Sequence, residues 1–219
     1  EISTRKAIDL NPLVFNSHFL LSNILIEQKK LEEAEIPLRK SIELKPDFAV
    51  AHSNLGSILK DLGNPKEAEI FARKAIELKP DFAVAHSNLG NILRDLGNLQ
   101  DAEISYRKAI EIKPNYADAY SNLGYLFIDL GKLEEAIIHF KKAVTLKPDD
   151  DKAVLALARL LYDEQKYELA LHYLSKSQSD SCLSLYLGCL LSLDREIDFN
   201  QKYRVLSEKK LCNAEIGSI

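Results

Sequence analysis

Two adjacent stretches of the sequence decide the fold, because the second repeats the first almost unchanged. Residues 46–79 read PDFAVAHSNLGSILKDLGNPKEAEIFARKAIELK, and residues 80–113 read PDFAVAHSNLGNILRDLGNLQDAEISYRKAIEIK. The two stretches are identical at 26 of 34 positions. Self-similarity at a fixed period of roughly 20–50 residues is typical of proteins whose repeats stack on their neighbours. The sequence therefore predicts a repeat architecture.

The same 34-residue frame extends in both directions. Five units follow one another at residues 12–45, 46–79, 80–113, 114–147 and 148–181, the last of them a weaker match. Residues 1–11 match the second half of a unit, and the chain contains no methionine, so we expect it to be part of a longer protein. After residue 181 the frame shifts, and residues 182–219 are interpreted as a degenerate unit or C-terminal cap. We expect one helix around Tyr186 and Gly188, which buries Cys182 and Cys189 in the core, and a partner helix at residues 199–211. We assign all 219 residues to one solenoid domain.

Each unit predicts two antiparallel helices. Apolar residues recur at helical spacing in both halves of residues 46–79. Gly63 is placed to end the first helix in a left-handed conformation, and Asn64 to cap the second, with Pro65 in its first turn and Glu67 completing a capping box. Pro80 ends the unit. The predicted fold is all-α: a right-handed α-solenoid, or superhelix, of stacked antiparallel helix pairs.

The recurring columns resemble the tetratricopeptide repeat (TPR). In residues 114–148 the family pattern reads Tyr120, Leu123, Gly124, Phe127, Ala136, Phe140 and Pro148. The resemblance covers residues 12–181 and implies a concave groove, lined by the first helices, that holds a protein or peptide. Lys29 and Gln165 depart from the pattern because they replace the closing glycine, and Pro37 is expected to kink the second helix of its unit.

Asparagines form the first candidate site column. Asn54, Asn88 and Asn122 stand 34 residues apart on the first helices. A carboxamide both donates and accepts hydrogen bonds, so it can pair with the backbone of an extended peptide. The column resembles the asparagine ladder of O-GlcNAc-transferase-type TPR arrays, which implies backbone-directed peptide holding. A solvated or inter-helix role for these side chains is an equally open interpretation.

An acidic column runs beside the asparagines and consists of Glu27, Asp61, Asp95, Asp129 and Asp163. These side chains could pair with a basic or hydroxyl-bearing ligand, although Lys60 and Arg94 stand next to two of them and could neutralise them locally. A solvated face is the alternative interpretation. The predicted peptide-binding site consists of three members of each column and three neighbouring side chains: Asn54, Asn88, Asn122, Asp61, Asp95, Asp129, Asn91, Arg94 and Tyr125.

Composition and motifs argue against other functions. A net charge of −4 disfavours nucleic acid, and no apolar run is long enough to span a membrane. His18, His52 and His86 recur at the repeat spacing, too far apart to share a metal ion, so they are predicted to pack. No catalytic motif occurs. We therefore expect no enzymatic activity, no catalytic residue, no metal and no cofactor. The three cysteines have no disulfide or zinc spacing, which favours a cytoplasmic setting.

The preferred function is a non-catalytic scaffold that binds a protein or peptide in its concave groove. The alternative is a substrate-docking or regulatory segment of a larger enzyme of the glycosyltransferase, sulfotransferase or oxygenase type. End-to-end self-association through the open first repeat is a further hypothesis. The identity of the partner cannot be read from one sequence.

Overall fold

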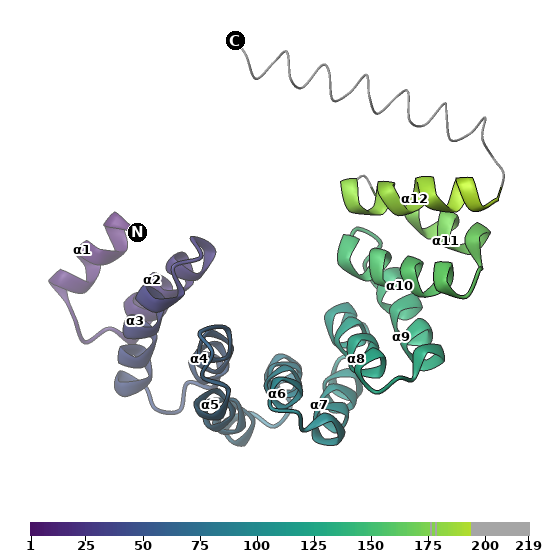
Figure 1. Ribbon diagram of the computed structural model, residues 1–219. Helices are drawn as coiled ribbons and strands as arrows, with labels where there is room; N and C mark the ends of the chain where they lie inside the picture. The colour runs from purple at the N-terminus through teal and green to yellow at the C-terminus, as the bar shows by residue number, and fades with distance from the viewer. Residues whose placement is uncertain (176, 178, 194–219) are drawn as a thin grey trace, which may run out of the picture. The chain divides into compact units, whose positions relative to one another are not determined.

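The fold is known from a computed structural model, which describes residues 1–193 except residues 176 and 178. This part of the chain contains helices and no strand, which confirms the all-α helical repeat (Figure 1). The helices are α1 (Ile2–Leu10), α2 (Phe15–Glu27), α3 (Leu31–Leu44), α4 (Ala49–Asp61), α5 (Pro65–Leu78), α6 (Ala83–Asp95), α7 (Leu99–Ile112), α8 (Ala117–Asp129), α9 (Leu133–Leu146), α10 (Asp151–Asp163), α11 (Tyr167–Leu174) and α12 (Asp180–Ser192).

The chain divides into two compact units, Glu1–Leu126 and Phe127–Ile219, and the division falls inside α8. The assignment of the whole chain to one domain stays a prediction. In the first unit, α2 packs on α3, α4 on α5, and α6 on α7. The first helices α2, α4 and α6 lie along one side of this row and the second helices α3, α5 and α7 along the other (Figure 1). We call these two sides the first-helix face and the second-helix face.

In the second unit, α9 packs on α10, α10 on α11, and α12 on both α10 and α11. Helix α12 confirms the helix that the sequence predicts around Tyr186 and Gly188. Cys182 and Cys189, which this helix carries, are fully buried, as expected of core residues. The predicted partner helix at residues 199–211 lies outside the described residues.

The turn that closes each first helix has the predicted left-handed residue. Gly63 has φ +82°, and the next amide, of Asn64, donates a 2.8 Å hydrogen bond to the carbonyl of Leu59. Gly97 and Gly131 repeat this geometry at 34-residue spacing. Lys29 and Gln165 adopt it too, with φ of 59° and 60°, although a side chain disfavours that region. The repeat therefore imposes one turn on every unit, including the two that lack its glycine.

The capping box predicted at the start of α5 is wrong. Asn64 precedes the helix and Pro65 occupies its first turn, but the Asn64 side chain makes no capping hydrogen bond. Its backbone (φ −110°, ψ 57°) is held by the closing turn and lies away from the extended conformation that N-caps usually adopt. Glu67 instead accepts a 2.6 Å hydrogen bond from Arg39 of the preceding repeat.

Two glycines on the first helices leave no room for a side chain. A Cβ atom at Gly56 would lie 3.0 Å from the carbonyl oxygen of Ala68, and one at Gly90 would lie 2.5 Å from the ring of Tyr106. Both neighbours are fully buried. Pro37 is also buried, and α3 continues through it to Leu44. The proline therefore does not end its helix, and the predicted kink stays a prediction.

Candidate functional site

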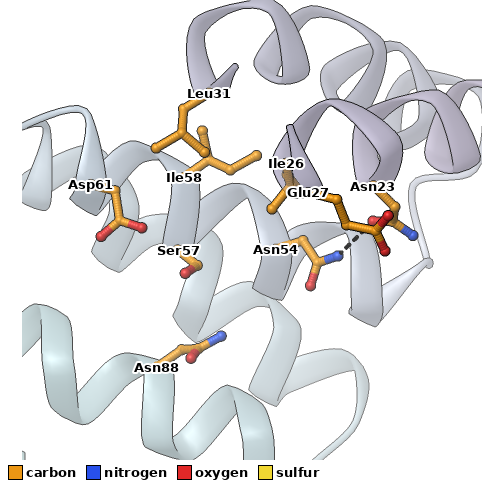
Figure 2. Close-up of a pocket in the computed structure, with 9 residues that line it drawn as sticks. All are labelled: Asn23, Ile26, Glu27, Leu31, Asn54, Ser57, Ile58, Asp61 and Asn88. Carbon is orange, nitrogen blue, oxygen red and sulfur yellow. Dashed lines mark hydrogen bonds between the residues drawn. The ribbon is translucent and has the colours of Figure 1, made fainter. Parts of the chain in front are cut away.

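The asparagine column lies on the first-helix face, half-buried, and each member bonds to the preceding repeat. Nδ2 of Asn88 donates to Oγ of Ser53 at 3.0 Å, and Nδ2 of Asn122 donates to Oγ of Ser87 at 3.3 Å. Nδ2 of Asn54 instead donates to Oδ1 of Asn23 at 3.3 Å, as Figure 2 shows. The carboxamides therefore have the inter-helix role that the sequence left open.

The same carboxamides keep an unused acceptor. Among the described residues, no protein group donates a hydrogen bond to Oδ1 of Asn54, Asn88 or Asn122. Ser53 and Ser87 accept the hydrogen bonds of Asn88 and Asn122. These two serines are 0% and 2% exposed and are not accessible to a ligand. The inter-repeat bonds thus fix the orientation of the asparagines and leave their oxygens available for a donor outside the chain.

The predicted site residues of the acidic column are exposed at the ends of α4, α6 and α8. Nζ of Lys60 lies 2.8 Å from Oδ1 of Asp61 and 3.9 Å from Oδ2 of Asp95. The local neutralisation predicted from Lys60 is therefore present for two members of the column. Exposed pairs of this kind are each worth less than ~1 kcal/mol, so a basic ligand could displace Lys60 at little cost.

The remaining predicted site residues have partners within the protein. Oδ1 of Asn91 accepts a 2.7 Å hydrogen bond from the hydroxyl group of Tyr106, which commits that oxygen to the interior. The guanidinium carbon of Arg94 lies 5.9 Å from the centre of the Tyr125 ring, so the two form a cation–π contact between α6 and α8. Asn91, Arg94 and Tyr125 are all half-buried.

A pocket of about 270 Å³ opens on the first-helix face between α2, α4 and α6 (Figure 2). It brings together three predicted site residues, Asn54, Asp61 and Asn88. Asn91, Arg94, Asp95, Asn122, Tyr125 and Asp129 do not line it. The complete lining consists of Asn23, Ile26, Glu27, Leu31, Asn54, Ser57, Ile58, Asp61 and Asn88.

Several lining residues were missed from the sequence. Asn23 and Ser57 stand 34 residues apart in the same column as Asn91, so the repeat itself carried a signal for them. Ile26, Leu31 and Ile58 form an apolar part of the lining, which the polar columns of the sequence do not indicate. The pocket thus combines amide oxygens, the carboxylates of Glu27 and Asp61, and an apolar surface, a combination suited to a peptide with a basic side chain.

The histidine column has a structural role. The Nε2 atoms of His18, His52 and His86 each lie 2.8–2.9 Å from the carbonyl oxygen of the proline six residues earlier. Tyr120 makes the corresponding contact, through its hydroxyl group, to Pro114 at 3.3 Å. Within the part of the chain that the structure describes, no cluster of three or more His, Cys, Asp or Glu side chains could hold a metal. None of the helices described there is long and apolar enough to cross a membrane.

Family models agree with the repeat frame. One model described as a tetratricopeptide repeat matches residues 15–48 and again 49–82, and a second model of the same description matches residues 81–149. Residues 129–196 match the model of subunit 3 of the anaphase-promoting complex, or cyclosome. No curated protein sequence matches the chain significantly.

Solved structures share the fold. PilF of Pseudomonas aeruginosa superimposes with a TM-score of 0.74 at 23% identity, covering 89% of this chain and 90% of its own. PilW, a type IV pilus biogenesis factor, superimposes with a TM-score of 0.73 at 20% identity. The match covers 84% of this chain and 88% of the PilW chain. A chain of the Cut9–Hcn1 hetero-tetramer of the APC/C superimposes with a TM-score of 0.74 at 18% identity. The match covers 85% of this chain and 38% of that chain. At these identities the likeness concerns the fold alone.

Proposed function

Because residues 15–149 of this chain are tetratricopeptide repeats, we propose that the chain is a scaffold that binds a peptide or protein segment along its first-helix face. The pocket lined by Asn54, Asp61 and Asn88 carries the proposal, since it unites members of both predicted columns. The proposed role is non-catalytic and the proposed location is cytoplasmic. Of the fold relatives, Cut9 assembles with another protein, Hcn1, which is the kind of role proposed here.

The proposed binding mode begins with the asparagines. Amide groups of a bound backbone donate to Oδ1 of Asn54 and Asn88, the acceptors that the inter-repeat bonds leave unused. These contacts do not depend on the sequence of the ligand. Asn122 continues the row on α8, which is the arrangement implied by the resemblance to O-GlcNAc-transferase-type arrays.

Selectivity comes from the carboxylates. Glu27 and Asp61 both line the pocket, and both are exposed. A lysine or arginine of the ligand pairs with them and displaces Lys60 from Asp61. The apolar side chains of Ile26 and Ile58 then cover the methylene part of the basic side chain. The expected ligand is therefore an extended, basic peptide segment.

A peptide array tests this proposal. The native chain is applied to synthetic peptides arranged in pairs that differ only in the exchange of lysine for glutamate, and the retained peptides are measured by calorimetry. We expect retention of lysine-bearing members and a loss of affinity of about tenfold or more when Asn54, Asn88 and Asn122 are all changed to Ala. An array that retains no peptide, or that retains glutamate members preferentially, would contradict the proposal.

A matched control separates binding from stability. Changing Ser53 and Ser87 to Ala removes the internal acceptors of Asn88 and Asn122 but leaves every carboxamide in place. This variant is expected to lose stability like the asparagine variant but to lose less peptide affinity, because it frees the orientation of the carboxamides and still keeps every Oδ1 acceptor. An equal loss of affinity in both variants would show that the asparagines act on the repeat stack and not on the ligand.

The alternative role, as the substrate-docking segment of a larger enzyme, uses the same face. In that role the chain is joined to a catalytic domain. Peptide binding by the chain is expected for both roles and therefore does not distinguish them. Assay of the full-length gene product with a retained peptide as substrate distinguishes them, because the docking role requires the peptide to be modified.

A further inference from the structure

The second-helix face of the first unit carries a column of exposed isoleucines. In the first unit these are Ile2, Ile36, Ile70 and Ile104, spaced by 34 residues and 75%, 73%, 67% and 66% exposed. In the second unit, Ile138 continues the series at 63%. A single exposed apolar residue needs no explanation, but the recurrence of one exposed isoleucine on each of α1, α3, α5 and α7 gives the first unit an apolar row along its second-helix face. We call it the isoleucine stripe.

Four of these isoleucines, those of α3, α5, α7 and α9, each stand between an acid and a base on the same helix face. The residue three positions earlier is acidic and the residue three positions later is basic, and side chains at this spacing are neighbours on a helix. The triplets are Glu33–Ile36–Arg39, Glu67–Ile70–Arg73, Asp101–Ile104–Arg107 and, in the second unit, Glu135–Ile138–Lys141. The helices α3, α5, α7 and α9 therefore share one orientation of charge about the apolar centre.

Ion pairs between neighbouring helices join two of these triplets. Nη2 of Arg39 on α3 lies 2.6 Å from Oε1 of Glu67 on α5. Nη2 of Arg5 on α1 lies 3.9 Å from Oε2 of Glu33 on α3. The basic residue of the α3 triplet thus meets the acidic residue of the α5 triplet, and Arg5 of α1 makes the corresponding contact to the α3 triplet.

A two-fold axis that lies in this face and runs along the row of second helices makes the face complementary to itself. The rotation reverses the direction of the helices, so the acid of each triplet in one copy faces the base of a triplet in the other, and isoleucine faces isoleucine. Interfaces of two-fold dimers use the same patch on both copies, which requires this kind of self-complementarity. Opposite charges at matching positions align the copies, and burial of the isoleucines supplies the affinity.

From this geometry we propose that the isoleucine stripe is the interface of a closed, two-fold dimer of the chain through its second-helix faces. The first-helix face stays open to ligand in this dimer. The arrangement differs from end-to-end association, which joins the ends of the repeat rows and produces open polymers. It does not depend on the proposed peptide binding.

Light scattering and sedimentation equilibrium of the full chain test the dimer. From micromolar to millimolar concentration, the mass should rise from 24.7 kDa and level off at twice that value. Changing Ile36, Ile70 and Ile104 to Ser should weaken dimerisation by about tenfold or more, because each is exposed in the monomer and buried in the dimer. As a matched control, Leu20→Ser removes a 52% exposed apolar side chain from the first-helix face and should leave dimerisation unchanged.

Charge reversal tests the two-fold arrangement itself. One variant carries Glu33→Lys, Glu67→Lys and Asp101→Lys, which makes the face basic, and a second carries Arg39→Glu, Arg73→Glu and Arg107→Glu, which makes it acidic. Neither should dimerise alone, whereas an equimolar mixture should form a mixed dimer. As a control, thermal unfolding of each variant is measured to establish that both are folded.

Four results would overturn the proposal. They are a mass fixed at 24.7 kDa throughout the series, a mass that grows without a limit, dimerisation that survives the isoleucine changes, and a mixture of charge variants that stays monomeric. Binding of the native chain, but not of the serine variant, to phosphatidylserine vesicles would assign the stripe to a lipid surface instead.

Discussion

The hydroxyl group of Tyr106, on the second helix of its repeat, donates a 2.7 Å hydrogen bond to Oδ1 of Asn91 on the first helix. The ring of Tyr106 lies fully buried against Gly90, one residue before Asn91. The glycine therefore contacts the ring of Tyr106, and the asparagine binds its hydroxyl group. This relationship orients Asn91 from the interior of the helix pair, beneath the first-helix face.

The first prediction concerns the space at Gly90. Gly90→Ala would place a methyl group 2.5 Å from the Tyr106 ring, and the buried ring has no room to move. We expect a destabilisation of about 1–3 kcal/mol, measured by urea unfolding. Combining Gly90→Ala with Tyr106→Ala should cost less than the sum of the two single changes. Additive costs would show that the ring does not limit the site.

The second prediction concerns the two turns without glycine. Lys29→Gly and Gln165→Gly should each stabilise the chain by about 0.5–1 kcal/mol, because glycine adopts φ near +60° without steric strain. The reverse change, Gly63→Ala, should destabilise it by a similar amount, although no atom crowds a Cβ there. Denaturant midpoints measure all three. A destabilised Lys29→Gly variant would contradict the argument.

The third prediction concerns the bond between repeats. Asn88→Ala and Ser53→Ala each remove one partner of the 3.0 Å hydrogen bond. Each change should cost about 1 kcal/mol, and the double variant should cost less than the sum, with a coupling energy of about 0.5–1.5 kcal/mol. The same cycle with Asn88 and Ser3, which lies on the non-adjacent helix α1 of the same unit, should show no coupling and serves as the control.

The fourth prediction concerns Cys189. Burial raises the pKa of its thiol from 9.0 to about 11, so the folded chain holds the unreactive, protonated form at pH 8. Its modification by a thiol reagent should follow global or local unfolding, and urea should accelerate it. The unfolded thiol ionises first as the pH rises, so this group's contribution to stability is complete below pH 9 and is lost as the pH approaches 11. Rapid labelling in the native chain would contradict its burial.

The fold could be predicted from the sequence because the same spacing of apolar residues, glycines and prolines recurs in each repeat. The helix ends followed from Gly63, Gly97 and Gly131, and the turn extended to Lys29 and Gln165 because neighbouring repeats impose it. The capping box failed for a physical reason: the spacing from Asn64 to Glu67 fits a local bond, but Arg39 from another repeat binds Glu67. A local motif cannot reveal a competitor that is distant in the sequence.

The candidate site was predicted in part. The sequence placed Asn54, Asp61 and Asn88 on one face, and the structure brings them to one pocket. The sequence could not show which end of each carboxamide is already hydrogen-bonded, because the acceptor of the Asn88 amide, Ser53, lies 35 positions away in the chain. The use of Asn91 by Tyr106 was hidden for the same reason. The pattern of columns shows which residues face one way, but not which atoms are already bonded.

The hydrogen bonds from Asn88 to Ser53 and from Asn122 to Ser87 also have a mechanical consequence. Each joins one repeat only to the next, so a pulling force on the row is carried by these bonds in series, together with the packing around them. Under load the repeats should give way one at a time, in steps of equal length. Such a row behaves as an elastic element that yields gradually and re-forms when the tension is released.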